Sequence, residues 1–251
     1  MACVWKVSDG LAQLDAPGFS GCVLLDKPWQ GLHGIHCRGR AADGLWLFQT
    51  PEPAPQSGAE DQTEILDWYV RQSDLVVTYA ASDAWPVQTE LQWRAAEAGE
   101  DKASVCIDLL VSLQTDLLES DPTLHVGCEL PPGELLHLDD AAAGRFVPVE
   151  EGEAAFTRTS ADAAGLLLLR PNDGAESLAL AIHPKDFQRL TASGAPANGW
   201  RLGAELFGPP LEKGVIRRGW LRAAFTARSD DERQALEFYN DLAHAAPPLA
   251  T

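Results

Sequence analysis

The chain has 251 residues, of which 45% are hydrophobic and 22% are charged, and these are ordinary values for a folded protein. The length suits one large domain or two small ones. The 37 acidic and 19 basic residues give a net charge of −18, a field that repels phosphate backbones and anionic membranes, so we expect no nucleic acid or membrane partner.

The N-terminal segment and the cysteines predict a cytoplasmic protein. Residues 1–10 have neither the basic nor the apolar region of a signal peptide, and no apolar run approaches the roughly 18 residues of a membrane-spanning helix. The cysteines are scattered and include no CxxC pair: Cys3, Cys22, Cys37, Cys106 and Cys128. This pattern favours reduced thiols over a disulfide framework or a zinc site.

Short apolar or alternating runs, separated by Gly, Pro and Asp, predict strands throughout the first fifty residues. Examples are CVLLDKP, LHGIHCR and LWLFQT. We expect these strands to join the main sheet. Residues 51–64 are rich in proline, glycine and acid, which predicts a long exposed loop within a single domain of residues 1–251.

Longer strands follow this loop. In residues 103–115 one set of alternate positions is wholly apolar and the other is mixed, as in half-buried antiparallel strands. A helix is the competing interpretation, but the β-branched residues Val105, Ile107 and Val111 fall on alternate positions and favour a strand.

The segment DAWPVQTELQWR, residues 83–94, divides cleanly with a period of two. One side is suited to a core and carries Trp85, Val87, Thr89, Leu91 and Trp93. The other side is a row of hydrogen-bonding groups, Gln88, Glu90, Gln92 and Arg94. We refer to these four residues as the polar row.

The C-terminal third predicts a hairpin, further strands and one helix. Residues 166–184 read as a hairpin around a type I turn at 171–174. The helix is expected to begin at Ser229, with Glu232 completing a capping box, and to end before Pro247. About a dozen strands and this helix indicate an all-β fold, a large antiparallel β-sandwich, with a single barrel as the alternative.

The polar row is the first candidate binding surface. Its amides, carboxylate and guanidinium could bind the hydroxyls of a sugar, and Trp85 or Trp93, if turned outward, could stack on the ring. The competing interpretation is a solvated sheet face with the tryptophans in the core.

His183 is the candidate proton donor, because it ends an apolar strand and a histidine titrates near neutrality. The alternative is a loop histidine that caps a turn. Glu205 or Glu212 is the candidate base. Arg218, Trp220 and Arg222 share one side of a later strand and could hold an acidic sugar, or could brace an edge strand through ion pairs.

The segment HGIHC offers His33, His36 and Cys37, but the two histidines of a strand at this spacing face opposite ways. We therefore expect no metal site here. No phosphate-binding loop, dinucleotide fingerprint or HExxH motif is present in the sequence, and we expect no cofactor.

Three segments together resemble the galactose mutarotase-like β-supersandwich proteins: DLVVTYAASDAWPVQTELQWRA, LALAIHPKDF and LEKGVIRRGWLRAAF with the helix that follows. The resemblance is one of pattern and covers residues 64 to 251. It implies two packed antiparallel sheets with a sugar-binding concave face. In aldose 1-epimerases of this type, a histidine acid and a carboxylate base on that face open and close the hexose ring.

Three hypotheses for function follow. The first is a hexose mutarotase-like epimerase, with His183 as acid, Glu205 or Glu212 as base, and a sugar bound by the polar row. The second is a carbohydrate-binding module without catalysis. The third is a structural or interaction protein, a homodimer through an uncovered sheet, with no sugar ligand.

Overall fold

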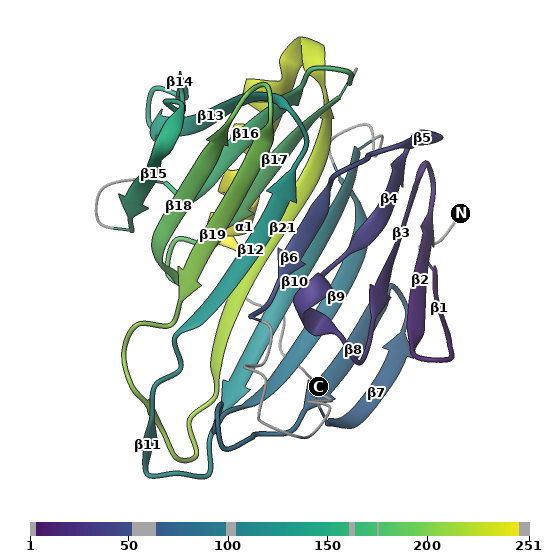
Figure 1. Cartoon of the computed structure of the whole chain (residues 1–251), viewed down its shortest axis with the longest axis vertical. Helices are drawn as coiled ribbons and strands as arrows, with labels where there is room; N and C mark the ends of the chain where they lie inside the picture. Colours follow the sequence, from purple (N-terminus) through teal and green to yellow (C-terminus); the bar gives the residue numbers. More distant parts are fainter. Residues whose placement is uncertain (1–3, 52–63, 99–103, 161–163, 175, 246–251) are drawn as a thin grey trace.

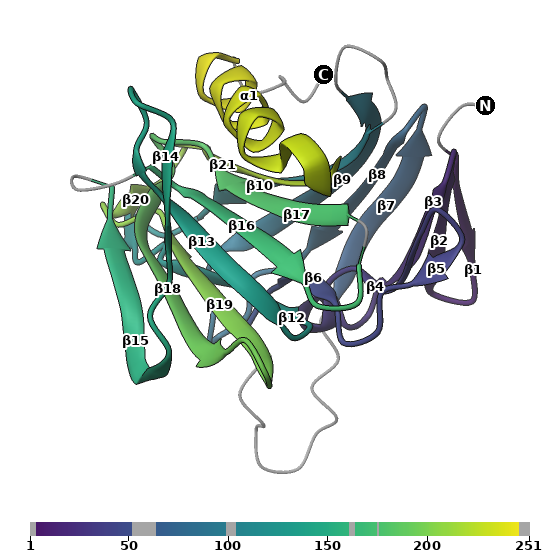
Figure 2. The same ribbon diagram turned by 90° about the horizontal axis from the view of Figure 1, so that it is seen from above.

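The structure is a computed structural model that describes residues 4–51, 64–98, 104–160, 164–174 and 176–245. In this part of the chain every paired strand is antiparallel, and two sheets pack face to face with helix α1 (Asp231–His244) on the outside (Figures 1 and 2). The predicted all-β sandwich with a C-terminal helix is confirmed. The predicted loop falls almost wholly on residues 52–63, outside the described residues.

We call the nine-stranded layer the large sheet. Its strands, in spatial order, are β14 (Arg145–Pro148), β13 (Gly133–Asp140), β16 (Leu166–Pro171), β17 (Glu176–Ile182), β21 (Arg217–Ala227), β10 (Ser104–Gln114), β9 (Gln88–Ala98), β8 (Asp74–Tyr79) and β7 (Ile65–Arg71). Residues 104–114 are a strand, as predicted, and β16 and β17 form the predicted hairpin.

The facing layer is the small sheet. Its strands, in spatial order, are β15 (Gly152–Thr159), β18 (Phe187–Ala195), β19 (Gly199–Leu206), β12 (Leu124–Leu130) and β6 (Trp46–Gln49). A short ladder of β11 (Glu119–Ser120) and β20 (Leu211–Glu212) lies outside both layers.

The first strands were expected to join the main sheet, but β1–β5 form a third, N-terminal sheet, and β6 joins the small sheet. The N-terminal sheet contains β1 (Val4–Ser8), β2 (Leu11–Ala16), β3 (Phe19–Leu24), β4 (His33–Cys37) and β5 (Arg40–Ala41), and the turn η1 (Pro28–Gln30) follows β3. Tight turns at Asp9–Gly10 and Arg38–Gly39, with positive φ at all four residues, pair consecutive strands locally.

One hydrophobic core joins the three sheets. Trp93 of the large sheet, Phe187 of the small sheet and Leu14 of the N-terminal sheet are all buried in it. A second, smaller core lies on the other side of the large sheet, where Phe238 and Leu242 of α1 cover Leu110 and Trp220. Each strand of the large sheet under α1 therefore has apolar residues on both faces.

The helix begins later than predicted, after a short turn η2 (Arg228–Asp230), and the capping-box prediction is wrong. Asp230 occupies the cap position without a side-chain cap hydrogen bond. Instead, Arg170 of β16 donates two hydrogen bonds to the buried Asp231, at 2.9 and 2.8 Å, which ties the first turn to the sheet. In the described residues, no helix is long and apolar enough to cross a bilayer.

His183 lies just beyond β17, buried near the C-terminal end of α1. Its N–H donates to the Trp220 carbonyl at 2.9 Å, and its Nδ1 lies 3.5 Å from Oδ2 of Asp186. Asp186 accepts the N–H of Trp220 at 3.0 Å. Burial lowers the pKa of His183 and raises the pKa of Asp186 to about 6.

This burial predicts a pH-dependent effect of Asp186→Asn on stability. The folded protein holds the Asp186 proton up to about pH 6, whereas the unfolded chain releases it near pH 4, so this contribution to stability is lost as the pH rises between these values. Asparagine keeps an acceptor for Trp220 and carries no charge. Relative to wild type, the variant should gain on the order of 2 kcal/mol between pH 4 and pH 7.

Urea unfolding of both proteins across this pH range measures the difference. His183 is present in both, so its own titration largely cancels. A difference that stays constant from pH 4 to pH 7 would show that Asp186 is not shifted by burial.

Candidate functional site

The sandwich has two outward faces, and the candidate residues from the sequence are divided between them. The outward face of the large sheet carries α1 and the polar row, whereas the outward face of the small sheet is turned toward the viewer in Figure 1. We call the latter the small-sheet face.

The structure brings the polar row of β9 close to Arg218, Trp220 and Arg222 of β21, because β10 lies between these strands and is hydrogen-bonded to both. Asp108 lies between Arg94 and Arg222, Leu110 between Gln92 and Trp220, and Ser112 between Glu90 and Arg218. Gln88, at the start of β9, pairs with Gln114. The predicted alternation of residues 85–94 is confirmed: Leu91 and Trp93 are buried in the core and the polar row faces outward.

Most of these groups are engaged with one another. Arg94 donates two hydrogen bonds to Asp74, at 2.8 and 2.7 Å, and Gln92 donates a third at 2.7 Å. Arg222 binds the buried Asp108 in the same bidentate way, at 2.7 and 3.0 Å. Arginine and carboxylate groups that satisfy each other brace neighbouring strands and leave few donors for a ligand.

The two tryptophans do not form a stacking wall on this face. Trp93 has 0% exposure, and the half-buried Trp85 packs against the same core and donates its indole N–H to Thr89 at 3.1 Å. Trp220 is also buried, under α1. Trp85 and Trp93 share the apolar side of the strand, and the structure shows that this side is the buried one.

The structure does not bring His183 to either candidate base. His183 lies on the large sheet, whereas Glu205 lies on β19 of the small sheet and points away from the core. Glu212 is exposed in the short β20 strand, opposite Glu119. An acid–base pair built on His183 and either glutamate is therefore not formed.

Glu205 has another histidine beside it. The register of β12 and β19 places His125 directly opposite Glu205, and β18 places Arg189 on the other side. Directly opposite residues have Cβ atoms about 5 Å apart. Arg189 makes an ion pair with Glu205. The three strands thus bring an imidazole, a carboxylate and a guanidinium into one row.

Next to this row, the small-sheet face carries a pair of glycines, and the Thr191 hydroxyl packs against one of them, Gly203. Gly127 and Gly203 are opposite each other in the ladder of β12 and β19, and we call this pair the glycine floor. Gln49 is paired with Gly127 on one side, and Thr191 with Gly203 on the other. Rows on one side of a strand are about 7 Å apart, so the floor adjoins His125 and Glu205.

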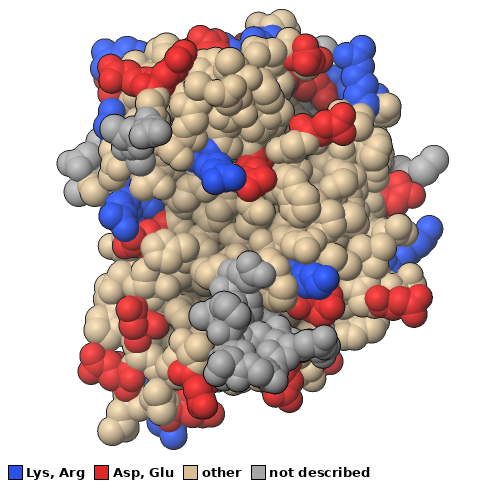
Figure 3. All heavy atoms as spheres, in the orientation of Figure 1, with Lys and Arg blue, Asp and Glu red and all other residues tan. Residues whose placement is uncertain are grey.

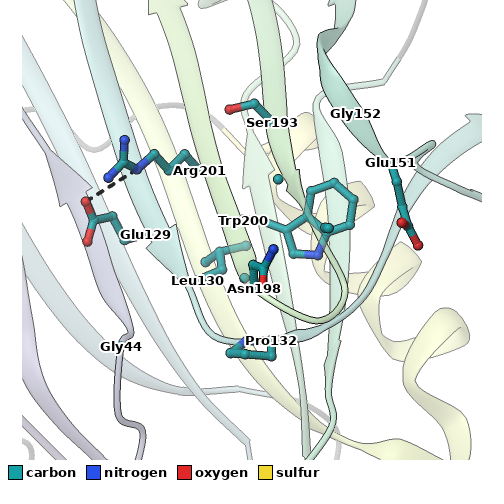
Figure 4. A pocket seen from close by; sticks show the side chains of 13 residues that line it. Gly44, Glu129, Leu130, Pro132, Glu151, Gly152, Ser193, Asn198, Trp200 and Arg201 are labelled. Carbon is teal, nitrogen blue, oxygen red and sulfur yellow. Dashed lines mark ion pairs between the residues drawn. The ribbon is translucent and has the colours of Figure 1, made fainter.

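The same face continues into an open pocket of about 820 Å³. Figure 4 shows Arg201 and Glu129 on one side of it, with Trp200 and Leu130 behind; Arg201 Nε is 3.9 Å from Glu129 Oε1. These two charged residues are opposite each other in the ladder, one row beyond the glycine floor. The floor thus lies between two polar rows.

An aromatic pair borders the face on the β6 side. Trp46 stacks on His33 with ring centroids 4.9 Å apart and an angle of 15° between the planes. Trp46 is in the same strand as Gln49 and is paired with Glu129 of β12.

Among the described residues, no group of three or more side chains is placed to hold a metal ion. Figure 3 shows wide tan areas on the uncovered part of this face, interrupted by neighbouring side chains of opposite charge.

The sequence reasoning missed His125 and the glycine floor, although a pattern for both is present. Strand β12 contains HVGCE and strand β19 contains RLGAE, so each has a polar residue, a glycine and an acid at alternate positions. When two such strands pair antiparallel, the glycines coincide and each basic residue meets an acid. No single strand contains this information.

Comparison with known proteins supports the fold. No family model and no curated protein matches the chain in sequence. Among solved structures, the Slr1438 protein of Synechocystis sp. PCC 6803 is 10% identical with a TM-score of 0.58, covering 90% of this chain and 100% of that one.

Two further structures carry the name "putative aldose 1-epimerase". The one from Klebsiella pneumoniae is 9% identical with a TM-score of 0.58 and covers 99% of this chain and 91% of its own. The one from Escherichia coli K12 is 8% identical with a TM-score of 0.54 and covers 90% of this chain and 99% of its own. The chain therefore has the galactose mutarotase-like β-supersandwich fold that its strand pattern resembles.

Proposed function

We propose that the small-sheet face binds a sugar and that Glu205 and His125 interconvert its anomers, as an aldose 1-epimerase does. The observation that carries this proposal is the row His125–Glu205–Arg189 beside the glycine floor. The names of two structural neighbours point to the same substrate class. Glu205 keeps the role of base expected from the sequence, and His125 takes the role expected of His183.

The chemistry needs one base and one acid and no cofactor. Glu205 accepts the proton of the anomeric hydroxyl while His125 protonates the ring oxygen, and the bond between that oxygen and the anomeric carbon breaks. The open-chain aldehyde turns about its first carbon–carbon bond. Reversal of both proton transfers closes the ring with the other configuration.

The surroundings suit a neutral, hydroxyl-rich ring. The glycine floor lets the ring approach the backbone most closely at Gly127, because the Thr191 hydroxyl lies over Gly203 and donates to its carbonyl at 3.2 Å. Gln49 and Thr191 lie at its two sides as hydrogen-bonding groups, and the Trp46 ring is on the β6 margin as an apolar surface. A neutral sugar is not repelled by the net charge of −18.

The first test is anomer exchange of glucose and galactose, followed by saturation-transfer proton NMR with purified protein near pH 7. Wild type should exceed the buffer rate. Glu205→Gln and His125→Ala should each lower the rate by about 100-fold or more, as expected when one proton-transfer group is removed.

Glu212→Gln is the matched control, because it makes the same chemical change in the exposed β20 strand. It should leave exchange unchanged. Sugar binding without exchange in wild type would favour the binding-module hypothesis, and retention of exchange in Glu205→Gln would remove this residue from the mechanism.

A second test fills the glycine floor. A Cβ atom at Gly127 would have its nearest neighbour, the Leu202 carbonyl oxygen, at 3.4 Å, which is ordinary contact. Gly127→Ala and Gly127→Val should therefore fold while raising the floor by increasing amounts. We expect the affinity for sugar to fall from wild type to alanine to valine, measured by titration calorimetry.

Thermal unfolding of the two variants is the control for this series. Unfolding temperatures close to wild type, with affinity unchanged in Gly127→Val, would place the sugar elsewhere than on the floor.

A further inference from the structure

Strand β7 is an exposed edge of the large sheet. In the described part of the chain it pairs only with β8, and Figure 1 shows it at the margin of the sheet. Its side chains are unusually apolar for an edge: Trp68 is 46% exposed, Tyr69 41% and Val70 39%. Natural edges are normally protected by charge, proline, short length or a covering element.

The opposite edge of the same sheet shows such protection. Strand β14 has four residues, begins with Arg145 in an ion pair with Asp139, and ends in Pro148. Strand β7 has seven residues and no proline; its two charges, Asp67 and Arg71, flank an apolar stretch at residues 68–70, and its register with β8 shifts only before Asp67. The middle of β7 is therefore less protected against pairing than β14 is.

The pairing of β7 with β8 determines which backbone N–H and C=O groups of β7 remain available to a further strand. A two-residue turn connects β7 to β8 and closes on the Arg71–Asp74 pair. In an antiparallel ladder, alternate residues direct their N–H and C=O groups to opposite neighbours. The backbone groups of Arg71 and Tyr69 bond to β8. The backbone N–H and C=O groups of Trp68 and Val70 therefore point to the open edge.

The charges of β7 are arranged symmetrically about Tyr69. Asp67 and Arg71 are each two residues from it and lie on the same side of the strand. In an antiparallel pair of two β7 strands centred on Tyr69, Asp67 of each copy is opposite Arg71 of the other, and Trp68 is opposite Val70. Opposite charges directly across a ladder stabilise the pairing.

Other registers lose this complementarity. Centring the pair on Trp68 puts Asp67 opposite Tyr69, and centring it on Val70 puts Tyr69 opposite Arg71. Only the Tyr69 register matches both charges, and a two-fold axis through this point gives the isologous interface of a closed dimer.

We propose that the protein forms a homodimer by antiparallel pairing of β7 with β7 of a second copy, centred on Tyr69. The two large sheets then continue into one, with matching faces on the same side. The contact lies on the large sheet, whereas His125 and Glu205 lie on the small one, so the dimer leaves the proposed sugar site open. The inference does not depend on the proposed function.

A single cysteine tests the register. Residues in a pair that is not hydrogen-bonded have Cα atoms about 4.5 Å apart, which a disulfide can bridge. Tyr69→Cys, opposite its own copy, should therefore give a covalent dimer on mild oxidation, seen on a non-reducing gel. Val70→Cys is the matched control, because it is opposite Trp68 and should give no covalent dimer; wild type reports any link through the native cysteines.

Sedimentation at micromolar concentration tests the contact itself. Wild type should be a dimer, and Asp67→Arg, which creates two repulsive pairs, should raise the dissociation constant about tenfold or more. Asp67→Arg combined with Arg71→Asp should restore it. A monomeric wild type, failure of the exchange to restore the dimer, or equal cross-linking at positions 69 and 70 would each overturn the proposal.

Discussion

The core shared by the three sheets fixes which side of every strand can meet a ligand. Trp93, Leu202 and Leu14 come from different sheets and are buried in the same cluster. Because side chains alternate along a strand, burial of one set commits the next residue to the opposite face. Arg201 and Gly203 therefore face outward for the same reason that Trp200 and Leu202 face inward.

The two outward faces that result are not equivalent. On the large sheet, Asp108 is 2% exposed and bound to Arg222, so removal of either partner would leave a buried charge unpaired. Polar residues there hold strands together under α1. On the small-sheet face the charged residues are more exposed, Arg201 at 81% and Arg189 at 52%, and they border the glycine floor. Charged side chains that pair at the surface and stay accessible are the better candidates for binding.

The sequence was sufficient for properties that depend on neighbouring residues. Alternation predicted the strand at 104–114 and the two sides of residues 85–94, but it left open which of these sides is buried. The Pro-Asn-Asp-Gly turn predicted the β16–β17 hairpin. The sequence was insufficient for properties that depend on distant residues. His125 and Glu205 are eighty residues apart, and nothing in either strand states that they pair. The helix-cap prediction was wrong for the same reason, because the first turn of α1 is held by Arg170, a distant residue of β16 that binds Asp231.

Placement of the site on paired strands has a consequence for its precision. His125, Glu205 and the glycine floor are positioned by consecutive rungs of one ladder, and the buried residues Val126 and Ala204 hold that ladder on the core. A shift of one residue between β12 and β19 would turn one set inward and separate the glycines. The register that buries the core therefore also assembles the histidine, the carboxylate and the floor. Rigid strands hold such groups more closely than loops do, which suits the two proton transfers proposed for this site.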